Sequence, residues 1–149
     1  MVYPEPNCQV IIPPDTPDAT LFVSVGQTYN QPDPTTKKVP PSADCARGYW
    51  WARNLNDASA ERCKWLMARD RNIIVGVWKI APGEPKWEHW SKRPIETRPF
   101  PRGTKISQDR YVCLVEDVDT TIWEKFVGKK VQLVLPNDRY HPVHGYFKD

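Results

Sequence analysis

The side chains best suited to ligand chemistry in this sequence are aromatic and basic, and they occur together. The chain has 149 residues and 7 tryptophans, and Tyr49, Trp50 and Trp51 follow one another between Arg47 and Arg53. Aromatic faces stack on nucleobases, and guanidinium groups bind phosphates through paired N–H donors. This segment therefore predicts a surface that binds nucleic acid or a nucleotide. The competing interpretation is that the aromatic side chains only fill strands and the core.

The candidate site residues fall into two sets. The side chains expected to bind a base are Trp50, Trp51, Asn54, Trp78, Trp87 and Trp90. The basic side chains expected to bind phosphates are Arg47, Arg53, Arg98, Arg102 and Lys105. Side chains alternate along a strand, so Trp50 and Trp51 should point to opposite faces, one into the core and one to the surface. We expect at least one of Trp50, Trp51 and Trp78 to line an open cleft.

Catalytic motifs are missing from the sequence. It contains no phosphate-binding loop, dinucleotide fingerprint or GxSxG turn. His141 and His144 form an HxxH pair, but a structural zinc site needs about four ligands in a recognisable spacing. We therefore predict no catalytic residue, no metal and no cofactor. His89, which lies between Trp87 and Trp90, keeps an RNase or deaminase-like enzyme as an alternative.

Charge, cysteine content and hydropathy indicate the kind of ligand and the cellular compartment to expect. The net charge of +3 is uneven: residues 1–36 have four acidic side chains and no Lys or Arg, whereas residues 37–149 hold all 21 basic side chains against 14 acidic ones. A basic domain attracts phosphates. The four cysteines have no CxxC spacing, which favours reduced thiols in the cytoplasm. No apolar run approaches the ~20 residues of a membrane span, and no signal peptide is recognisable, so we predict no membrane association.

The pattern of strands and helices predicts a small α+β domain. Nine of the 16 prolines lie within the first 41 residues, which indicates an extended arm over 1–18 that packs little, followed by a single domain over 19–149. We predict strands over 21–25, 45–52, 72–80, 111–115, 131–135 and 143–147. Residues 81–110 should form a long loop with a short strand at 95–98.

Two short helices complete this prediction. One starts at Asn56 or Asp57 and runs to residue 68, and the other is capped by Asp119, reaches residue 126 and is stopped by Gly128. The first helix should connect the Trp50 strand to the 75–78 strand within one sheet. Together the elements predict a strongly bent sheet or an open β-barrel.

Several segments resemble the accessory domain that follows the nuclease in some GIY-YIG nuclease proteins. They are Ala46-Arg47-Gly48-Tyr49-Trp50-Trp51, Ile74-Val75-Gly76-Val77-Trp78-Lys79-Ile80, Phe126-Val127-Gly128-Lys129-Lys130-Val131 and His141-Pro142-Val143. The resemblance covers about residues 20–147, and residues 81–110 depart from it. No GIY or YIG segment is present, so the resemblance does not imply nuclease chemistry.

A second resemblance is to the PUA-like class, which includes the EVE, YTH and ASCH domains. This chain shares with those domains the order of its elements: a strand with tryptophans, a turn with an asparagine, a helix, and a strand with Val-Gly-Val. Those domains are small α+β barrels that read nucleic acids, often through a modified base in an aromatic cage. This resemblance implies that Trp50, Trp51 and Asn54 hold the positions of ligand residues, and that Trp78 faces the pocket.

The leading interpretation is a non-catalytic module that binds nucleic acid or a nucleotide through an aromatic pocket and a basic loop. It includes the reading of a modified base. The first alternative is a phage-type anti-defence protein that sequesters a signalling nucleotide or inhibits a host defence nuclease, which would have a protein partner. Two further hypotheses are an RNase or deaminase-like enzyme and an interaction domain whose tryptophans are all core.

Overall fold

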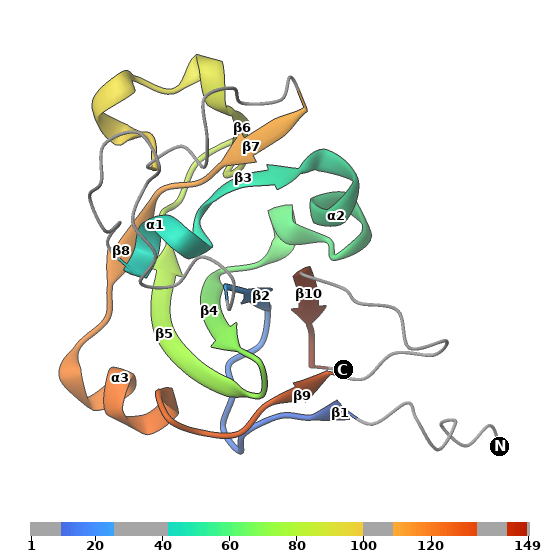
Figure 1. Ribbon diagram of the computed structural model, residues 1–149, viewed down its shortest axis with the longest axis vertical. Helices are drawn as coiled ribbons and strands as arrows, with labels where there is room; N and C mark the ends of the chain where they lie inside the picture. Colours follow the sequence, from blue (N-terminus) through green and yellow to red (C-terminus); the bar gives the residue numbers. More distant parts are fainter. Residues whose placement is uncertain (1–9, 26–41, 100–108, 134–142, 149) are drawn as a thin grey trace, which may run out of the picture.

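A five-stranded mixed sheet forms the lower half of the molecule in Figure 1. The computed structural model describes residues 10–25, 42–99, 109–133 and 143–148. The strand order is β10-β2-β4-β5-β8. These strands are β2 (Thr20–Ser24), β4 (Trp65–Asp70), β5 (Ile73–Ile80), β8 (Val115–Asp117) and β10 (Val143–Tyr146). Strands β2 and β5 confirm the prediction over 21–25 and 72–80.

Strand β4 lies at the centre of this sheet and is buried on both faces. It pairs in parallel with β2, so that Leu66 lies beside Leu21 and Met67 beside Phe22. All four side chains are fully buried. A strand that is covered on both faces is apolar at consecutive positions, rather than at every second one. This explains the unbroken run of apolar residues from 65 to 68.

The predicted helix from Asn56 or Asp57 to residue 68 is therefore wrong. A shorter helix, α2 (Ala52–Asp57), starts earlier, and a single 3₁₀ turn, η1 (Ala60–Arg62), follows it before β4 begins. Residues 65–69 contain Leu, Met, Ala and Arg, which are good helix formers in isolation. Burial between β2 and β5 overrides that local preference.

A smaller three-stranded sheet lies above the first one in Figure 1 and has the order β3-β7-β6. Its strands are β3 (Gly48–Trp51), β6 (Glu88–His89) and β7 (Arg110–Val112). The prediction that the Trp50 strand and the 75–78 strand share one sheet is wrong, because β3 and β5 belong to different sheets. The predicted strand also starts too early, since residues 42–46 form the helix α1 (Ser42–Ala46).

One nearly continuous stretch of chain serves both sheets. Strand β7 pairs with β3 and β6, and β8 pairs with β5 after only Cys113 and Leu114. Both linking residues are themselves hydrogen-bonded: the Cys113 N–H donates to the Arg47 carbonyl at 2.9 Å, and the Leu114 carbonyl accepts from the Ala81 N–H at 2.9 Å. This stretch replaces the single strand expected over 111–115.

The second predicted helix is confirmed as α3 (Thr120–Phe126), which covers the lower face of the five-stranded sheet. The Asp119 carboxylate accepts a hydrogen bond from the Ile122 N–H at 2.9 Å, as expected of an N-cap. Gly128 adopts a φ of +90°, a conformation that favours glycine and ends the helix. The short strand expected at 95–98 is instead the 3₁₀ turn η3 (Ile95–Thr97), which follows η2 (Trp90–Lys92).

Residues 10–18 pack more than we expected of an extended arm. Strand β1 (Val10–Ile11) pairs with β9 (Gln132–Leu133), within the strand predicted over 131–135. Thr16 is buried and donates its hydroxyl to the Pro13 carbonyl at 2.6 Å. Ile12 packs against the core cluster beneath the sheet. Residues 1–9 lie outside the described part of the chain, and the boundary at 18/19 stays a prediction.

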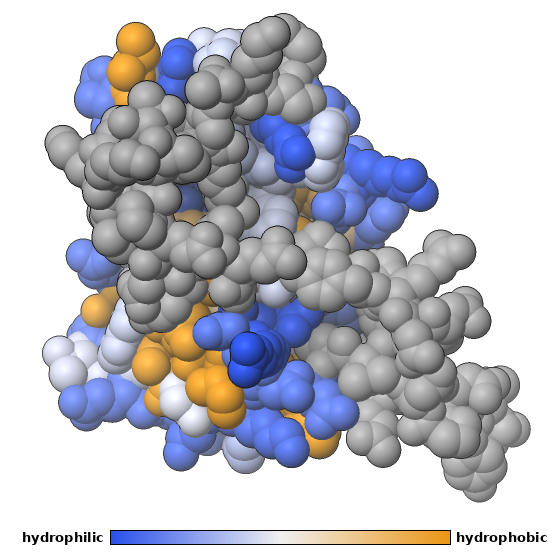
Figure 2. Space-filling view, in the orientation of Figure 1, coloured by the Kyte–Doolittle hydropathy of each residue, from blue (hydrophilic) through white to orange (hydrophobic). Residues whose placement is uncertain are grey.

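The predicted α+β class is confirmed, with three α-helices in the described residues instead of two and with sheets that do not close into a barrel. Figure 2 shows hydrophilic side chains over most of the described surface on this face, and hydrophobic ones gathered over β5. Ile73 of that strand is 43% exposed. No helix within the described ranges is long and apolar enough to cross a membrane.

Candidate ligand-binding pocket

An open pocket of about 490 Å³ lies between the α2–η1 segment and the strands of the smaller sheet. Its walls carry two aromatic rings, several small apolar side chains and a few polar groups. The lining residues are Ala52, Leu55, Asn56, Ser59, Ala60, Glu61, Arg62, Pro85, Trp87 and Tyr111. Ligand sites in proteins have this size and this mixture of apolar walls with few polar groups.

The first wall is formed by the turn that joins α2 to η1. Helix α2 ends at Asp57 with Ala58 as its C-cap, and Ser59 adopts the left-handed conformation with a φ of 55°, which turns the chain toward β4. Leu55 is buried in the core and also lines the pocket, together with the polar residues Asn56 and Ser59. A Cβ at Gly145 of β10 would collide with the Ala58 carbonyl, so this close approach of helix and strand requires glycine.

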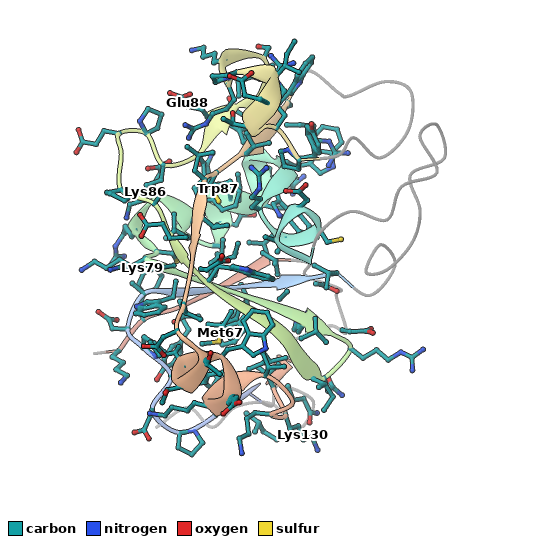
Figure 3. The ribbon with its side chains drawn as sticks, turned by 90° about the vertical axis from the view of Figure 1, so that its left-hand side faces the viewer. Met67, Lys79, Lys86, Trp87, Glu88 and Lys130 are labelled. Atoms are coloured by element: carbon teal, nitrogen blue, oxygen red, sulfur yellow. The ribbon has the colours of Figure 1, made fainter. Side chains whose placement is uncertain are left out.

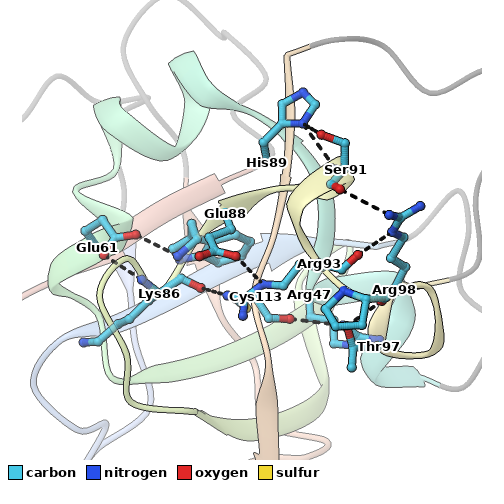
Figure 4. A network of polar contacts seen from close by, with 12 residues as sticks. Arg47, Glu61, Lys86, Glu88, His89, Ser91, Arg93, Thr97, Arg98 and Cys113 are labelled. Carbon is cyan, nitrogen blue, oxygen red and sulfur yellow. Dashed lines mark hydrogen bonds and ion pairs between the residues drawn. The ribbon is translucent and has the colours of Figure 1, made fainter.

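The second wall is formed by Trp87 and Tyr111. The Glu61 carboxylate fixes the chain at Trp87, because Oε1 accepts from the Trp87 N–H at 2.7 Å and Oε2 accepts from the Lys86 N–H at 3.0 Å (Figure 4). The Lys86 ammonium in turn donates to the Cys63 carbonyl at 3.2 Å. Figure 3 places Lys86 and Trp87 well above Met67 of the lower core, toward the smaller sheet. Glu61 therefore connects the two walls.

Tyr111 occupies the middle strand of the smaller sheet. It pairs with Trp50 on one side and with His89 on the other. Residues that pair directly across antiparallel strands share one face of a sheet. The His89 and Tyr111 rings meet edge to face, with centroids 5.6 Å apart. Trp50, His89 and Tyr111 thus form one aromatic row, of which Tyr111 reaches the pocket.

Trp50 and Trp51 face opposite sides of β3, as predicted. Trp50 is 7% exposed and donates its indole N–H to the Ala46 carbonyl at 2.6 Å. Trp51 is 40% exposed, and the Arg110 guanidinium lies 3.6 Å from its ring centroid. Arg110 also donates to the Tyr49 carbonyl at 3.1 Å, which holds it over the ring. The Trp51 ring therefore lies at the surface, and the Arg110 guanidinium already covers one of its faces.

The remaining predicted base-binding residues are dispersed. Trp78 is 3% exposed, belongs to β5 and packs edge to face against Trp123 at 5.7 Å. Trp90 is half-buried on η2, and its ring centroid lies 5.1 Å from the Arg98 guanidinium. Asn54 is on α2 but outside the pocket. The structure does not bring Trp50, Trp51 and Trp78 together in this pocket, and of the predicted set only Trp87 lines it.

Two of the predicted phosphate-binding arginines hold the fold. Arg47 pairs with Asp44 at 2.8 Å and donates to the Cys113 carbonyl at 3.1 Å. Arg98 donates to the carbonyls of Arg93 and Ser91 at 2.9 and 3.3 Å, and so shapes the 91–98 loop (Figure 4). Arg53 is exposed on α2. Arg102 and Lys105 lie outside the described residues.

Cys63, Cys113 and His89 carry the thiol and imidazole groups described near the pocket. Burial raises the pKa of the Cys63 thiol to about 12, and it also raises the pKa of Cys113, so both thiols stay neutral at ordinary pH. His89 Nδ1 lies 2.7 Å from the Ser91 hydroxyl but also accepts the Ser91 N–H, as the cap of a 3₁₀ turn. Within the described ranges no three His, Cys, Asp or Glu side chains gather as a metal site, and His141 lies outside them.

Comparison with known proteins identifies no relative of the chain. No protein-family model matches it, and neither does any curated protein or solved structure. The two resemblances noted in the sequence therefore stay predictions, and the assignment of the pocket depends on its own geometry.

Nine of the ten described lining residues were missed by reasoning from sequence, among them Asn56, Glu61, Arg62 and Tyr111. Residues 56–62 were assigned to a regular helix, in which Glu61 and Arg62 would have pointed away from Asn56. The break at Ser59 brings them to one pocket. Tyr111 could have been singled out, because it follows a basic loop and precedes an apolar strand. The local signal for the break is the cluster of Asn54, Asn56, Asp57 and Ser59, because these side chains favour turns over a helix interior.

Proposed function

We propose that this chain is a non-catalytic binding module whose pocket takes the base of a nucleotide, either free or within a nucleic-acid strand. The observation that carries the proposal is the pocket of about 490 Å³ in which Trp87, Tyr111 and Asn56 come together. Aromatic walls favour a flat ligand, and an amide supplies one donor and one acceptor to a base edge. The proposal moves the site from the predicted Trp50, Trp51 and Trp78 to the pocket that extends along α2 and η1.

The size and polarity of the pocket fit a small planar ligand better than a peptide or a lipid. A volume of about 490 Å³ accommodates a base with its sugar. Half of the ten lining side chains are apolar, while Asn56, Ser59 and Tyr111 supply neutral hydrogen-bonding groups. Such groups can orient a heterocycle without the desolvation of a buried charge.

The same pocket supports binding in preference to catalysis. The carboxylate among its described lining residues, on Glu61, already accepts two backbone hydrogen bonds and positions the opposite wall. The nearby Cys63 thiol is protonated at neutral pH. A catalytic nucleophile needs an adjacent base or a lowered pKa, and neither is found among the described lining residues.

Titration calorimetry with the full chain tests this proposal. The ligands are the four common ribonucleosides and their 5′-monophosphates, followed by short single-stranded DNA and RNA. Asn56→Ala should weaken the best of these ligands about 5- to 30-fold, because one or two hydrogen bonds to the base are lost. Asn54→Ala is the matched control, because Asn54 is on the same helix and outside the pocket. Equal affinity in both variants, or no binding of any ligand by the wild type, contradicts the proposal.

Salt dependence separates a free nucleotide from a strand. A strand that contacts several phosphates releases counterions, so its affinity falls steeply with salt, whereas a mononucleotide gives a shallow slope. Arg62 is the one cationic side chain among the described lining residues, and Arg47 and Arg98 are engaged within the fold. These observations favour a free nucleotide. Tight binding of a free nucleotide without strand binding would fit the sequestering role of a phage-type anti-defence protein.

A further inference from the structure

Arg62 differs from the other arginines around the pocket in what its guanidinium contacts. It ends η1, lines the pocket and is exposed to solvent. Its guanidinium carbon lies 4.4 Å from the centroid of the Phe147 ring. None of the ion pairs formed between described residues includes Arg62. Its charge is thus positioned by an aromatic ring and is not neutralised by a described carboxylate.

The neighbouring arginines bond to other parts of the protein. Arg93 pairs with Glu88 at 3.5 Å and donates to the Lys86 carbonyl at 2.9 Å. Arg47, Arg98 and Arg110 each donate to at least one backbone carbonyl. Arginines that stabilise a fold usually satisfy their N–H groups in this way. Arg62 instead lines the pocket as a residue and has its guanidinium over the Phe147 ring.

Stacking on Phe147 prepares Arg62 for an anion. A guanidinium above an aromatic face keeps its N–H donors in its own plane, where they remain free to form paired hydrogen bonds with a phosphate. Stacking also restricts the side chain before a ligand arrives, so less conformational freedom is lost on binding. Phe147 follows β10 directly and packs against the main core, which makes it a firm support.

The carboxylate of Glu61, on the same wall, does not neutralise this site. Both of its oxygens accept backbone N–H groups, at 2.7 and 3.0 Å, on the far side of the pocket. The two amide dipoles partly balance its charge. Arg62 is therefore the described lining group best able to attract a negatively charged part of a ligand.

We propose that Arg62, held by Phe147, binds the phosphate of a nucleotide whose base lies between Trp87 and Tyr111. This assignment rests on the proposed function and names the ligand class as nucleoside monophosphates rather than nucleosides. The pocket then has an aromatic end for the base and a cationic rim for the phosphate. Arg62 adds a member that the sequence-predicted phosphate set lacked.

Calorimetric titrations of each ribonucleoside and its 5′-monophosphate measure this assignment directly. The wild type should bind the monophosphate about 10- to 100-fold more tightly than the nucleoside, the range expected for charge-assisted hydrogen bonds. Arg62→Ala should abolish that preference and leave nucleoside affinity within about twofold. Arg62→Lys should restore only part of it, because an ammonium keeps the charge without the planar pair of donors. Arg53→Ala is the control, since Arg53 is exposed on α2 but does not line the pocket.

The outcomes distinguish the proposed role of Arg62 from the proposed function of the pocket. Nucleoside binding without a preference for phosphate, or a preference that survives in Arg62→Ala, overturns the role of Arg62 alone. Binding of a short strand without binding of any nucleoside or monophosphate overturns the assignment to free monophosphates, and failure of the wild type to bind nucleosides, monophosphates and strands alike overturns the proposed function as well. Phe147→Leu provides a second variant, which keeps Arg62 but removes the ring beneath it. It should lower the phosphate preference about threefold or more while its melting temperature reports any loss of folding.

Discussion

The two larger sheets of this molecule differ in how their side chains pack and what they contact. The five-stranded sheet buries apolar residues on both faces, the aliphatic Leu21, Leu66 and Val77 together with the aromatic Phe22 and Trp78. The three-stranded sheet carries Trp50, Trp51, His89 and Tyr111, and nearby arginines donate to its backbone carbonyls and those of the adjoining loop. The pocket lies beside the second sheet.

This difference separates stability from recognition. Aliphatic packing depends on the exclusion of water, which is non-directional and therefore does not orient a ligand. Aromatic and guanidinium groups retain polar edges and can bind while they pack. We therefore expect substitutions in the larger sheet to act on stability, and those at the rim of the smaller sheet to act on ligand binding. Variants at four places in the molecule test that division.

The largest effect is expected at Trp50, the member of the smaller sheet that belongs to the main core. Trp50→Ala should lower the free energy of unfolding by about 3–5 kcal/mol, because a large buried side chain leaves a cavity. Its neighbour Trp51 is 40% exposed, and Trp51→Ala should cost about 1 kcal/mol, mostly the loss of its stacking on Arg110. Urea unfolding of both variants measures the difference. Similar losses would show that the two faces of β3 are equally structural.

The second pair lies in the five-stranded sheet. Leu66→Ala on the central strand should lower the free energy of unfolding by about 2–5 kcal/mol through transfer and cavity terms. Ile73→Ala, at a side chain that is 43% exposed, should cost about 1 kcal/mol or less. Both variants should retain wild-type ligand affinity under conditions in which they remain folded. A specific loss of affinity in Leu66→Ala would contradict the division between the sheets.

The third pair concerns the carboxylate that joins the pocket walls. Glu61→Gln keeps the shape but offers one acceptor oxygen where two are used, so either Lys86 or Trp87 loses a partner for its N–H. We expect a loss of about 1–2 kcal/mol in thermal or urea unfolding, together with weaker ligand binding. Glu116→Gln, at an exposed position of β8, is the matched control and should change neither. Unchanged stability and ligand affinity in Glu61→Gln would show that the pocket walls keep their positions without this contact.

The smallest effect is a loss of stability at alkaline pH. Burial raises the pKa of Cys63 to about 12 in the folded protein, above its ordinary value of 9.0. The unfolded chain therefore releases this proton first, and the contribution of the neutral thiol is lost as pH rises from about 9 toward 12. Cys63→Ala should reduce the decline in unfolding free energy between about pH 8 and pH 10 by about 1 kcal/mol. Equal pH profiles for wild type and variant would contradict a protected thiol.

Local signals in the sequence were sufficient where a segment's structure depends on its own residues. The β-branched run of β5 and the Asp119 cap with Gly128 around α3 were both predicted and are both observed. Strand β4 was mistaken for a helix because its neighbours β2 and β5, and not its own propensities, determine its conformation.

The pocket was less predictable than the fold, for a physical reason. The alternation of Trp50 and Trp51 followed from strand geometry and is confirmed. Whether a buried tryptophan lines a cavity depends on the packing of other elements against it. Trp78 is covered by Trp123, whereas Trp87 borders the open space beside Asn56. Those contacts are long-range, and a single sequence does not reveal them.

The stretch from β7 to β8 links the two sheets without a hinge. Its two connecting residues are hydrogen-bonded to Arg47 on one side and to Ala81 on the other, so no free rotation remains between the sheets. Both sheets should then melt as one cooperative unit. A ligand bound beside the smaller sheet would slow amide hydrogen exchange as far away as β4 and β5, because every opening of that unit would also require release of the ligand.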